Sequence, residues 1–354
     1  MSTLPSLSPT SRQPGRRQAG RSRVAGQKPA ASVTSRLAAL ATSFAMKPSS
    51  SGYHAPVLLA EVLEALRPAP GKIFIDGTLG GGGHSEALLA AGARVVGIDQ
   101  DPAAIAEASA RLARFGDAFQ AIRSNFAAAG PALDALALPR VDGVLLDLGV
   151  SSHQLDEAAR GFSFMREGPL SMRMDPDAPL TAAELVNTMS AAQLERIIRM
   201  YGEEPAAKKI AARIVRDRAV SPFVTTLQLA ESVESVIPRR GKTHPATRVF
   251  QALRIAVNRE IDALTEALEQ FAARLSPGGR FAIISFHSLE DRPVKQYFAS
   301  RSAETIDHPT WPAARANPHR LFKKVTGKAV IAGDAEQKAN PRARSAKLRV
   351  VEKL

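Results

Sequence analysis

A glycine-rich loop followed by a carboxylate is the part of the sequence best suited to bind a ligand. The run Gly77–His84 reads GTLGGGGH, with four consecutive glycines, and Asp99 closes the next apolar segment. Glycines without Cβ atoms let the backbone approach a ligand closely and adopt positive φ. A carboxylate at the end of a second strand is placed to accept hydrogen bonds from both hydroxyls of a ribose. The pair predicts a cofactor that contains adenosine, because a purely structural turn would not need so many glycines.

Two kinds of adenosine cofactor fit this pattern, a nicotinamide dinucleotide and S-adenosylmethionine. The dinucleotide fingerprint requires G-x-G-x-x-G. Counted from Gly80 its third glycine is replaced by Ser85, and counted from Gly77 its second is replaced by Leu79. The phosphate-binding loop of nucleotide hydrolases is also broken, because His84 rather than a lysine follows the glycines. These failures favour S-adenosylmethionine.

Asp147 is the candidate catalytic residue. It ends the apolar run 143–146 and precedes the sequence LGVSS. The end of a fourth strand faces the reactive part of the cofactor in such folds, so we expect Asp147 to orient an acceptor amine or to hold the amino group of the donor. A helix N-cap is the alternative role for this side chain.

The absence of cysteine narrows the chemistry. The chain contains none, which excludes disulfides, thiolate zinc sites and the covalent cysteine adduct that methylation of pyrimidine carbon 5 requires. An exocyclic amine or a hydroxyl attacks the methyl group directly, and the enzyme then mainly aligns the acceptor. The sequence therefore predicts transfer to nitrogen or oxygen, with no metal site.

Alternating strands and helices predict the framework that positions these residues. Strands are expected at 72–76, 94–99, 118–123 and 143–147, and helices at 58–66, 85–91 and 102–115. This alternation indicates right-handed βαβ units and a parallel sheet. Ligands of such sheets lie at the carboxyl ends of the strands, which is where the glycine loop, Asp99 and Asp147 stand.

Residues 151 to about 243 show no comparable alternation of strands. Helical windows at 182–200, 206–219 and 227–236 predict a mostly helical insertion over residues 151–243. One long helix at 246–275, a strand at 280–286, a helix beginning at 293 and an edge strand at 346–351 complete the expected elements. The predicted fold class is α/β, with a Rossmann-like core of residues 53–150 and 244–354 and an inserted helical domain for substrate recognition.

Positive charge is concentrated at the N-terminus. The chain has 47 Lys and Arg against 34 Asp and Glu, a formal net charge of +13, and its first 50 residues hold eight of the basic residues and no acidic one. Residues 1–52 are predicted to be a disordered basic tail, although an organelle transit peptide has a similar composition and Met46 could begin a shorter chain. The charge indicates a polyanionic partner, and no apolar run is long enough to span a membrane.

Over residues 53–353 the chain resembles the bacterial small-subunit ribosomal RNA methyltransferase H family (RsmH, formerly MraW). The motifs that carry this resemblance are HAPVLL at 54–59, DGT with the glycines and HS at 76–85, LDLGVSS at 146–152, RGFSFMR at 160–166, MRMD at 172–175, YGEE at 201–204, HPATR at 244–248, SFHSLEDR at 285–292 and NPRARS at 340–345.

The resemblance implies N4-methylation of a cytidine in the decoding region of 16S ribosomal RNA within the small subunit, with S-adenosylmethionine as cofactor. It implies a cytoplasmic bacterial protein, or a mitochondrial one if the tail is a transit peptide, and leaves monomer and homodimer open. It also implies cofactor contacts at Gly82, Gly83, His84, Asp99, Phe126, Asp147 and Gln154. Phe126 is placed to pack on adenine, with ordinary core packing as the alternative.

Five further side chains are candidate RNA contacts. Phe162 and Phe164 could stack on a splayed base or pack in the core. Arg166 and Arg173 are expected to meet phosphates, and His287 is either a contact to the target base or a structural residue. A cytidine would have to be flipped out of its stack to reach the methyl donor.

Three other classes of protein compete with this interpretation: a nicotinamide-dependent oxidoreductase, a non-catalytic RNA-binding factor, and a DNA amino-methyltransferase. The last is disfavoured because the Asp/Ser/Asn-Pro-Pro-Tyr/Phe motif is missing after the fourth expected strand.

Overall fold

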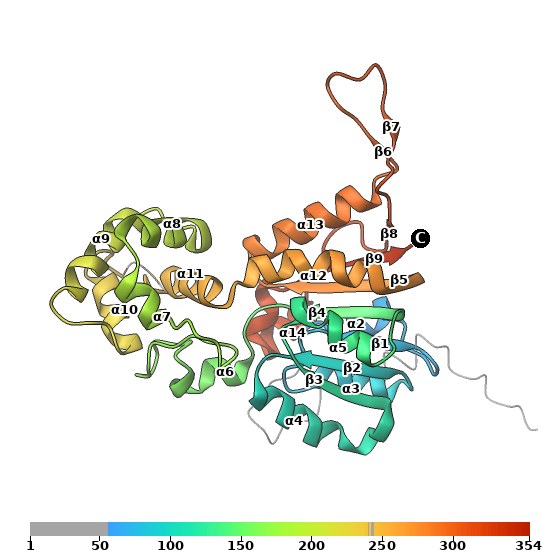
Figure 1. Cartoon of the computed structure of the whole chain (residues 1–354), viewed down its shortest axis with the longest axis horizontal. Coiled ribbons are helices and arrows are strands. Elements are labelled where there is room, and N and C mark those ends of the chain that lie inside the picture. Colours follow the sequence, from blue (N-terminus) through green and yellow to red (C-terminus); the bar gives the residue numbers. More distant parts are fainter. Residues whose placement is uncertain (1–55, 240, 242–243) are drawn as a thin grey trace, which may run out of the picture.

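The computed structural model describes residues 56–239, 241 and 244–354. The expected N-terminal tail, with its two alternative interpretations, lies outside the described residues. The described chain forms an α/β part around one large sheet and a separate group of helices beside it (Figure 1). No described helix has both the length and the apolar character to cross a membrane.

The large sheet has seven strands in the order β3-β2-β1-β4-β5-β9-β8. Its members are β1 Ile73–Asp76, β2 Arg94–Asp99, β3 Phe119–Arg123, β4 Val141–Asp147, β5 Leu275–Ser285, β8 Phe322–Lys324 and β9 Lys347–Lys353. Neighbours among β1 to β5 are parallel, whereas β9 is antiparallel to both β5 and β8. The chain order reverses between β1 and β4, and such a switch point is where ligands bind in open α/β sheets.

Side chains alternate between the two faces of the sheet, as the period of a strand requires. Phe74 and Leu145 join one hydrophobic cluster with helices α2 Leu59–Leu66, α3 Gly83–Ala90 and α4 Pro102–Leu112. Ile75 and Leu146 join a second cluster, on the opposite face, with α5 Gly130–Ala135, α12 Glu260–Arg274 and α13 Ser288–Ser302. The sheet is therefore covered on both faces, which confirms the predicted Rossmann-like α/β core.

A third hydrophobic cluster holds the group of helices together. It is formed by α7 Ala182–Thr188, α8 Ala191–Gly202, α9 Ala207–Arg218, α10 Thr226–Glu234 and α11 Thr247–Asn258. The window expected as one helix at 182–200 is two helices, because Met189 is extended and Ser190 starts α8 with a capping box to Gln193. Such a box satisfies the free N–H groups of a new helix.

Two expectations about the C-terminal half are wrong. The single helix expected at 246–275 is broken at Arg259, whose left-handed φ of 50° separates α11 from α12. The last strand, β9, is not at the edge of the sheet, because the unpredicted short strand β8 pairs with its outer side. The break at Arg259 places one helix in the helical group and the next against the sheet.

The remaining elements are short. Helix α13 starts at Ser288, earlier than expected, because His287 caps it in a box with Glu290. The other described elements are helices α6 Ser152–Asp156 and α14 Asp334–Ala339, the 3₁₀ turns η1 Ala113–Ala118, η2 Phe126–Ala128, η3 Ala158–Arg160 and η4 Pro341–Ser345, and the strands β6 Thr305–Ile306 and β7 Arg315–Ala316. The pair β6–β7 forms an arm that projects away from the sheet (Figure 1).

Candidate active site

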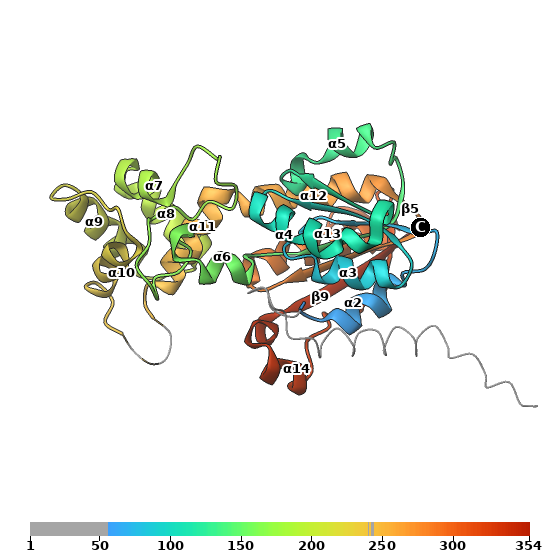
Figure 2. The same cartoon turned by 90° about the horizontal axis from the view of Figure 1, so that it is seen from below.

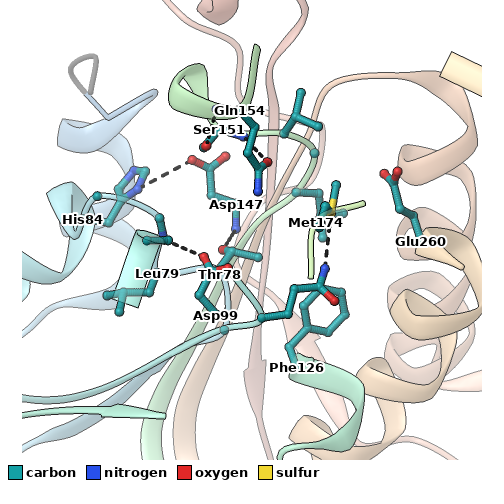
Figure 3. Close-up of a pocket in the computed structure, with 18 of the residues that line it drawn as sticks. Thr78, Leu79, His84, Asp99, Phe126, Asp147, Ser151, Gln154, Met174 and Glu260 are labelled. Atoms are coloured by element: carbon teal, nitrogen blue, oxygen red, sulfur yellow. Dashed lines mark hydrogen bonds and ion pairs between the residues drawn. The ribbon is translucent and has the colours of Figure 1, made fainter. Parts of the chain in front are cut away.

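A cleft opens at the carboxyl ends of β1, β2 and β4, where the strand order reverses. One wall consists of the glycine loop, the end of β2, the start of η2 and the loop after β4. The other wall includes Met174, Asn258 at the end of α11 and Glu260 at the start of α12. Figure 3 shows Met174 and Glu260 on the side of the cleft away from His84. The cleft therefore lies between the sheet and the helices, and its residues come from distant parts of the sequence.

The glycine loop is pressed against the neighbouring strands. A Cβ atom at Gly77 would overlap the side chain of Leu146, and the N–H of Gly77 donates to the carbonyl of Leu145 at 2.9 Å. Gly77, Gly80 and Gly83 line the cleft. Gly82 differs from the expectation that it faces the cofactor: it lies outside the lining and, with φ of 76°, packs towards α4.

Asp99 ends β2 and is anchored by the backbone around it. Its Oδ2 accepts a hydrogen bond from the N–H of Gly80 and its Oδ1 from the N–H of Asp101, both at 2.9 Å. Burial raises the pKa of Asp99 to about 6, although the two N–H donors stabilise the carboxylate and act to lower the pKa. Each oxygen keeps a second lone pair, and the side chain lines the cleft.

Asp147 ends β4 in the middle of the cleft. Its backbone N–H donates to Thr78 Oγ1 at 2.6 Å, which ties β4 to the glycine loop (Figure 3). Its Oδ1 is buried and has no hydrogen-bond partner among the described residues. Burial raises the pKa of Asp147 to about 7, with Arg342 opposing the rise and Glu290 adding to it. A buried acceptor without a donor is costly, so this atom is suited to receive an N–H group from a ligand.

His84 stands beside Asp147 and is neutral. Its Nε2 lies 2.9 Å from the carbonyl of Val57, and since a carbonyl only accepts, Nε2 carries the proton. Its Nδ1 lies 3.8 Å from Asp147 Oδ2. Burial lowers the pKa of His84, although Asp76 acts in the other direction. The ring thus presents a lone pair, rather than a positive charge, to Asp147.

Gln154 and Phe126, the other expected cofactor residues, also line the cleft. The side-chain Oε1 of Gln154 accepts from the N–H of Ser151 at 3.1 Å, and its Nε2 donates to Asp101 Oδ2 at 2.9 Å. Its amide therefore shapes the loop after β4. Phe126 begins η2 and packs against the cluster beneath the cleft. Of the seven expected cofactor residues, six line the cleft and Gly82 supports it from behind.

The expected aromatic RNA contacts are packed side chains. Phe162 is only 7% exposed and belongs to the core of the helical group, so the core interpretation replaces base stacking for this ring. Phe164 is half-buried, with its ring centroid 4.7 Å from those of His244 and Phe250. Neither ring is among the described residues that line the cleft.

The three expected polar RNA contacts have different surroundings. Arg166 is exposed, and its Nη1 donates a long hydrogen bond of 3.5 Å to the carbonyl of Asp156. Arg173 is half-buried and donates to Ser171 Oγ at 3.2 Å and to the carbonyl of Ala178 at 2.8 Å, so it braces its own loop. His287 caps α13 and lies 3.0 Å from Glu290 Oε1. None of these three residues is among the described residues that line the cleft, whereas Glu290, the partner of His287, is.

An ion-pair network that the sequence did not indicate lies behind the cleft wall at Glu260 and Glu290. Arg254 donates to both carboxylate oxygens of Glu260 at 2.8 Å and lies 3.9 Å from Glu290. Burial raises the pKa of Glu260. Burial would also raise the pKa of Glu290, but the hydrogen bond with His287 and the nearby positive charges lower it. Glu290 stood in a recognised motif, whereas Arg254 and Glu260 were hidden by the wrong expectation of one continuous helix.

The strand order, the antiparallel β9 beside β5 and a glycine loop at the switch point define a class I methyltransferase. The family model described as the MraW methylase family matches residues 51–354, and the chain belongs to this family. It is accordingly an enzyme that takes its methyl group from S-adenosylmethionine.

Curated relatives agree over nearly their whole lengths. The ribosomal RNA small subunit methyltransferase H of Anaeromyxobacter dehalogenans is 53% identical over 304 residues, which are 85% of this chain and 98% of that protein. The protein of the same name from Heliobacterium modesticaldum is 49% identical over 85% of this chain and 99% of its own. Among solved structures, an rRNA methylase from Streptococcus thermophilus covers 84% of this chain and 93% of its own at 14% identity and a TM-score of 0.38, too distant to inform the site.

Proposed function

We propose that this enzyme transfers a methyl group from S-adenosylmethionine to the exocyclic N4 of a cytidine in 16S ribosomal RNA, with the small ribosomal subunit as its substrate. The names of the curated relatives support ribosomal RNA of the small subunit as the acceptor. The choice of N4 rests on the resemblance to the family and on the chemistry of the cleft.

The observation that carries the proposal is the unpartnered Oδ1 of Asp147. A buried carboxylate oxygen lacks a donor among the described residues and lies in the wall of the cleft. The exocyclic amine of cytosine offers N–H donors of the kind this oxygen lacks. The chain has no cysteine, so the covalent route to pyrimidine carbon 5 is closed, whereas direct attack by an amine remains available.

The other cleft residues fit the cofactor. The glycine loop at Gly77 has no room for a side chain. Asp99 can still accept hydrogen bonds from ribose hydroxyls, and the ring of Phe126 is available to pack on adenine. When bound, S-adenosylmethionine supplies an electrophilic methyl group on a sulfonium. The role of the chain is to hold the acceptor amine in line through Asp147 and to exclude water.

We further propose that the helical group, which comprises the predicted insertion of residues 151–243 together with α11 Thr247–Asn258, forms the domain that recognises RNA beside the catalytic core. The exposure of Arg166 supports contact with RNA phosphates. The target base must leave its stack to reach a recessed carboxylate. The relatives are bacterial, which supports action in the bacterial cytoplasm and gives no support to the mitochondrial alternative.

The test is transfer of labelled methyl groups to purified small subunits that lack the modification and, in parallel, to free 16S RNA. Nucleoside analysis should find N4-methylcytidine in at least one of the two substrates. An Asp147→Ala variant should bind S-adenosylmethionine normally but lose most activity. Label in another nucleoside would refute the N4 assignment, and binding of RNA without any transfer would favour a non-catalytic factor. Full activity of the Asp147→Ala variant would refute the role of Asp147.

A further inference from the structure

The C-terminal motif Asn340–Ser345 has no role in the function proposed so far, although it reaches the active site. Its turn η4 lies next to α14, on the side of the sheet that also carries α2 (Figure 2). From this turn the side chain of Arg342 enters the cleft and forms part of its lining. Arg342, near the end of the chain, therefore lines the same cleft as the glycine loop and Asp147.

Arg342 holds the loop that follows Asp147. Its Nη1 donates to Ser152 Oγ at 3.0 Å, and its Nη2 donates to the carbonyl of Val150 at 2.6 Å. The guanidinium also lies 5.4 Å from the ring centre of Phe286, at the end of β5. These contacts link the loop after β4 to the loop after β5 through a single side chain.

The base of Arg342 is equally fixed. The side-chain oxygen of Asn340 accepts a hydrogen bond from the backbone N–H of Arg342 at 3.2 Å, and the next residue, Ala343, is 1% exposed in the core. An arginine whose backbone and guanidinium are both held by hydrogen bonds is not free to move over the surface and bind phosphates. Its rigid fork is suited to hold two acceptors in a defined orientation.

Arg342 is also part of the electrostatic environment of Asp147. Four ionisable side chains face this carboxylate from four elements: Asp76 from β1, His84 from α3, Glu290 from α13 and Arg342 from η4. His84 is neutral, and Glu290 disfavours a negative charge on Asp147, whereas Arg342 favours it. Removing Arg342 should therefore both free the loop and make the carboxylate harder to ionise.

We infer that Arg342 is a positioning residue for methyl transfer: its guanidinium fixes the loop Leu148–Ser152 directly after Asp147 and adds a positive charge to the surroundings of Asp147. This inference rests on the proposed role of Asp147 as the group that orients the acceptor amine. The matched comparison is Arg342→Met with Lys338→Met. Lys338 is an exposed cation on the adjacent α14, so both variants lose one positive charge and gain the same side chain.

The experiment measures kcat for methyl transfer to small subunits from pH 6 to 9, together with the affinity for S-adenosylmethionine. Arg342→Met should lower kcat about 10- to 100-fold, since small misplacements of reacting groups have effects of this size. The midpoint of its pH profile should rise by about one unit, as expected when a nearby opposite charge is removed. Lys338→Met should match the wild type in both respects. Arg342→Lys should keep the wild-type midpoint but recover only part of kcat, because it retains the charge without the fork.

Each outcome decides between the alternatives. A reduced kcat with an unchanged midpoint in Arg342→Met would overturn the inference and leave a purely structural residue, as would a shifted midpoint in Arg342→Lys. If Arg342→Met does not fold, Arg342→Gln replaces it, since Gln retains one donor for the Val150 carbonyl but no charge. A wild-type enzyme without activity on any cytidine would instead refute the proposed function, so the two failures are distinguishable.

Discussion

Replacing Asp147 by asparagine should make the protein more stable and less active at neutral pH. Burial raises the pKa of this carboxyl from 3.8 to about 7. The native state therefore holds the proton more tightly than the unfolded chain does. Between these two pH values the native state has more bound protons, so the free energy of unfolding falls as the pH rises. The asparagine side chain has nearly the same shape and does not titrate, so the variant lacks this loss of stability.

The size of the effect follows from the pKa difference. A shift of about three units, at about 1.4 kcal/mol per unit, corresponds to about 4 kcal/mol once the pH exceeds 7. Below about pH 4 both states carry the neutral acid, and this contribution vanishes. The difference in stability between Asp147→Asn and the wild type should thus grow by up to about 4 kcal/mol from pH 4 to pH 8. A constant offset is expected as well, because the amide is also a buried polar group.

Urea denaturation of both proteins at several pH values between 4 and 8 measures this difference in stability directly. Groups that titrate in both proteins, such as Asp99, contribute equally to both and do not affect the difference. On the same preparations, replacing the charged carboxylate acceptor with a neutral amide oxygen should lower methyl transfer by about tenfold. A stability difference that stays flat across this pH range would show that Asp147 titrates normally. Unchanged methyl transfer would show that the carboxylate does not orient the acceptor.

Three further predictions test other parts of the site. Asp99→Asn should weaken binding of S-adenosylmethionine about tenfold in calorimetry, and wild-type affinity should itself decline as the pH falls through about 6. Arg254→Met should lower the free energy of unfolding by about 3 kcal/mol in urea melts, because it leaves the carboxylate of Glu260 buried without its partner. Phe162→Ala should lower the free energy of unfolding by about 3 kcal/mol. Arg166→Ala should leave the melting curve unchanged and weaken RNA binding in a filter assay. A stable Phe162→Ala protein, or an Arg166→Ala protein that unfolds more easily, would contradict the environments assigned to these residues.

The residues at the carboxyl ends of the strands were predictable because the signals for a strand are local. The apolar runs before Asp99 and Asp147 define β2 and β4, and parallel topology brings their ends together. Arg342 was not predictable as a cleft residue, because it meets Ser152 across 190 positions of sequence. Contacts of this range depend on packing that no local pattern contains.

The loop before the helical group shows why Phe162 was hard to interpret from sequence. A stretch rich in Gly, Met and Arg has no periodicity, so the sequence left both base stacking and core packing open for this ring. In the structure Arg160 pairs with buried Asp101 at 2.7 Å, and Gly161, with φ of 74°, lies so close to the backbone of Pro169 that a Cβ atom would clash. These two contacts fold the loop inwards and bury the ring.

The electrostatic character of the cleft provides an argument for the cofactor that is independent of glycine spacing. Carboxylates outnumber guanidinium groups among the described residues of the lining: the acids are Asp99, Asp147, Glu260 and Glu290, and the bases are Arg111 and Arg342. Arg254 offsets part of the charge of Glu260 and Glu290, but a dinucleotide would still bring two negative phosphates close to Asp99 and Asp147, at a cost that grows as water is excluded. S-adenosylmethionine has no phosphate and carries a positive sulfonium. Since His84 is neutral and supplies no compensating cation, the charge of the cleft favours the methyl donor.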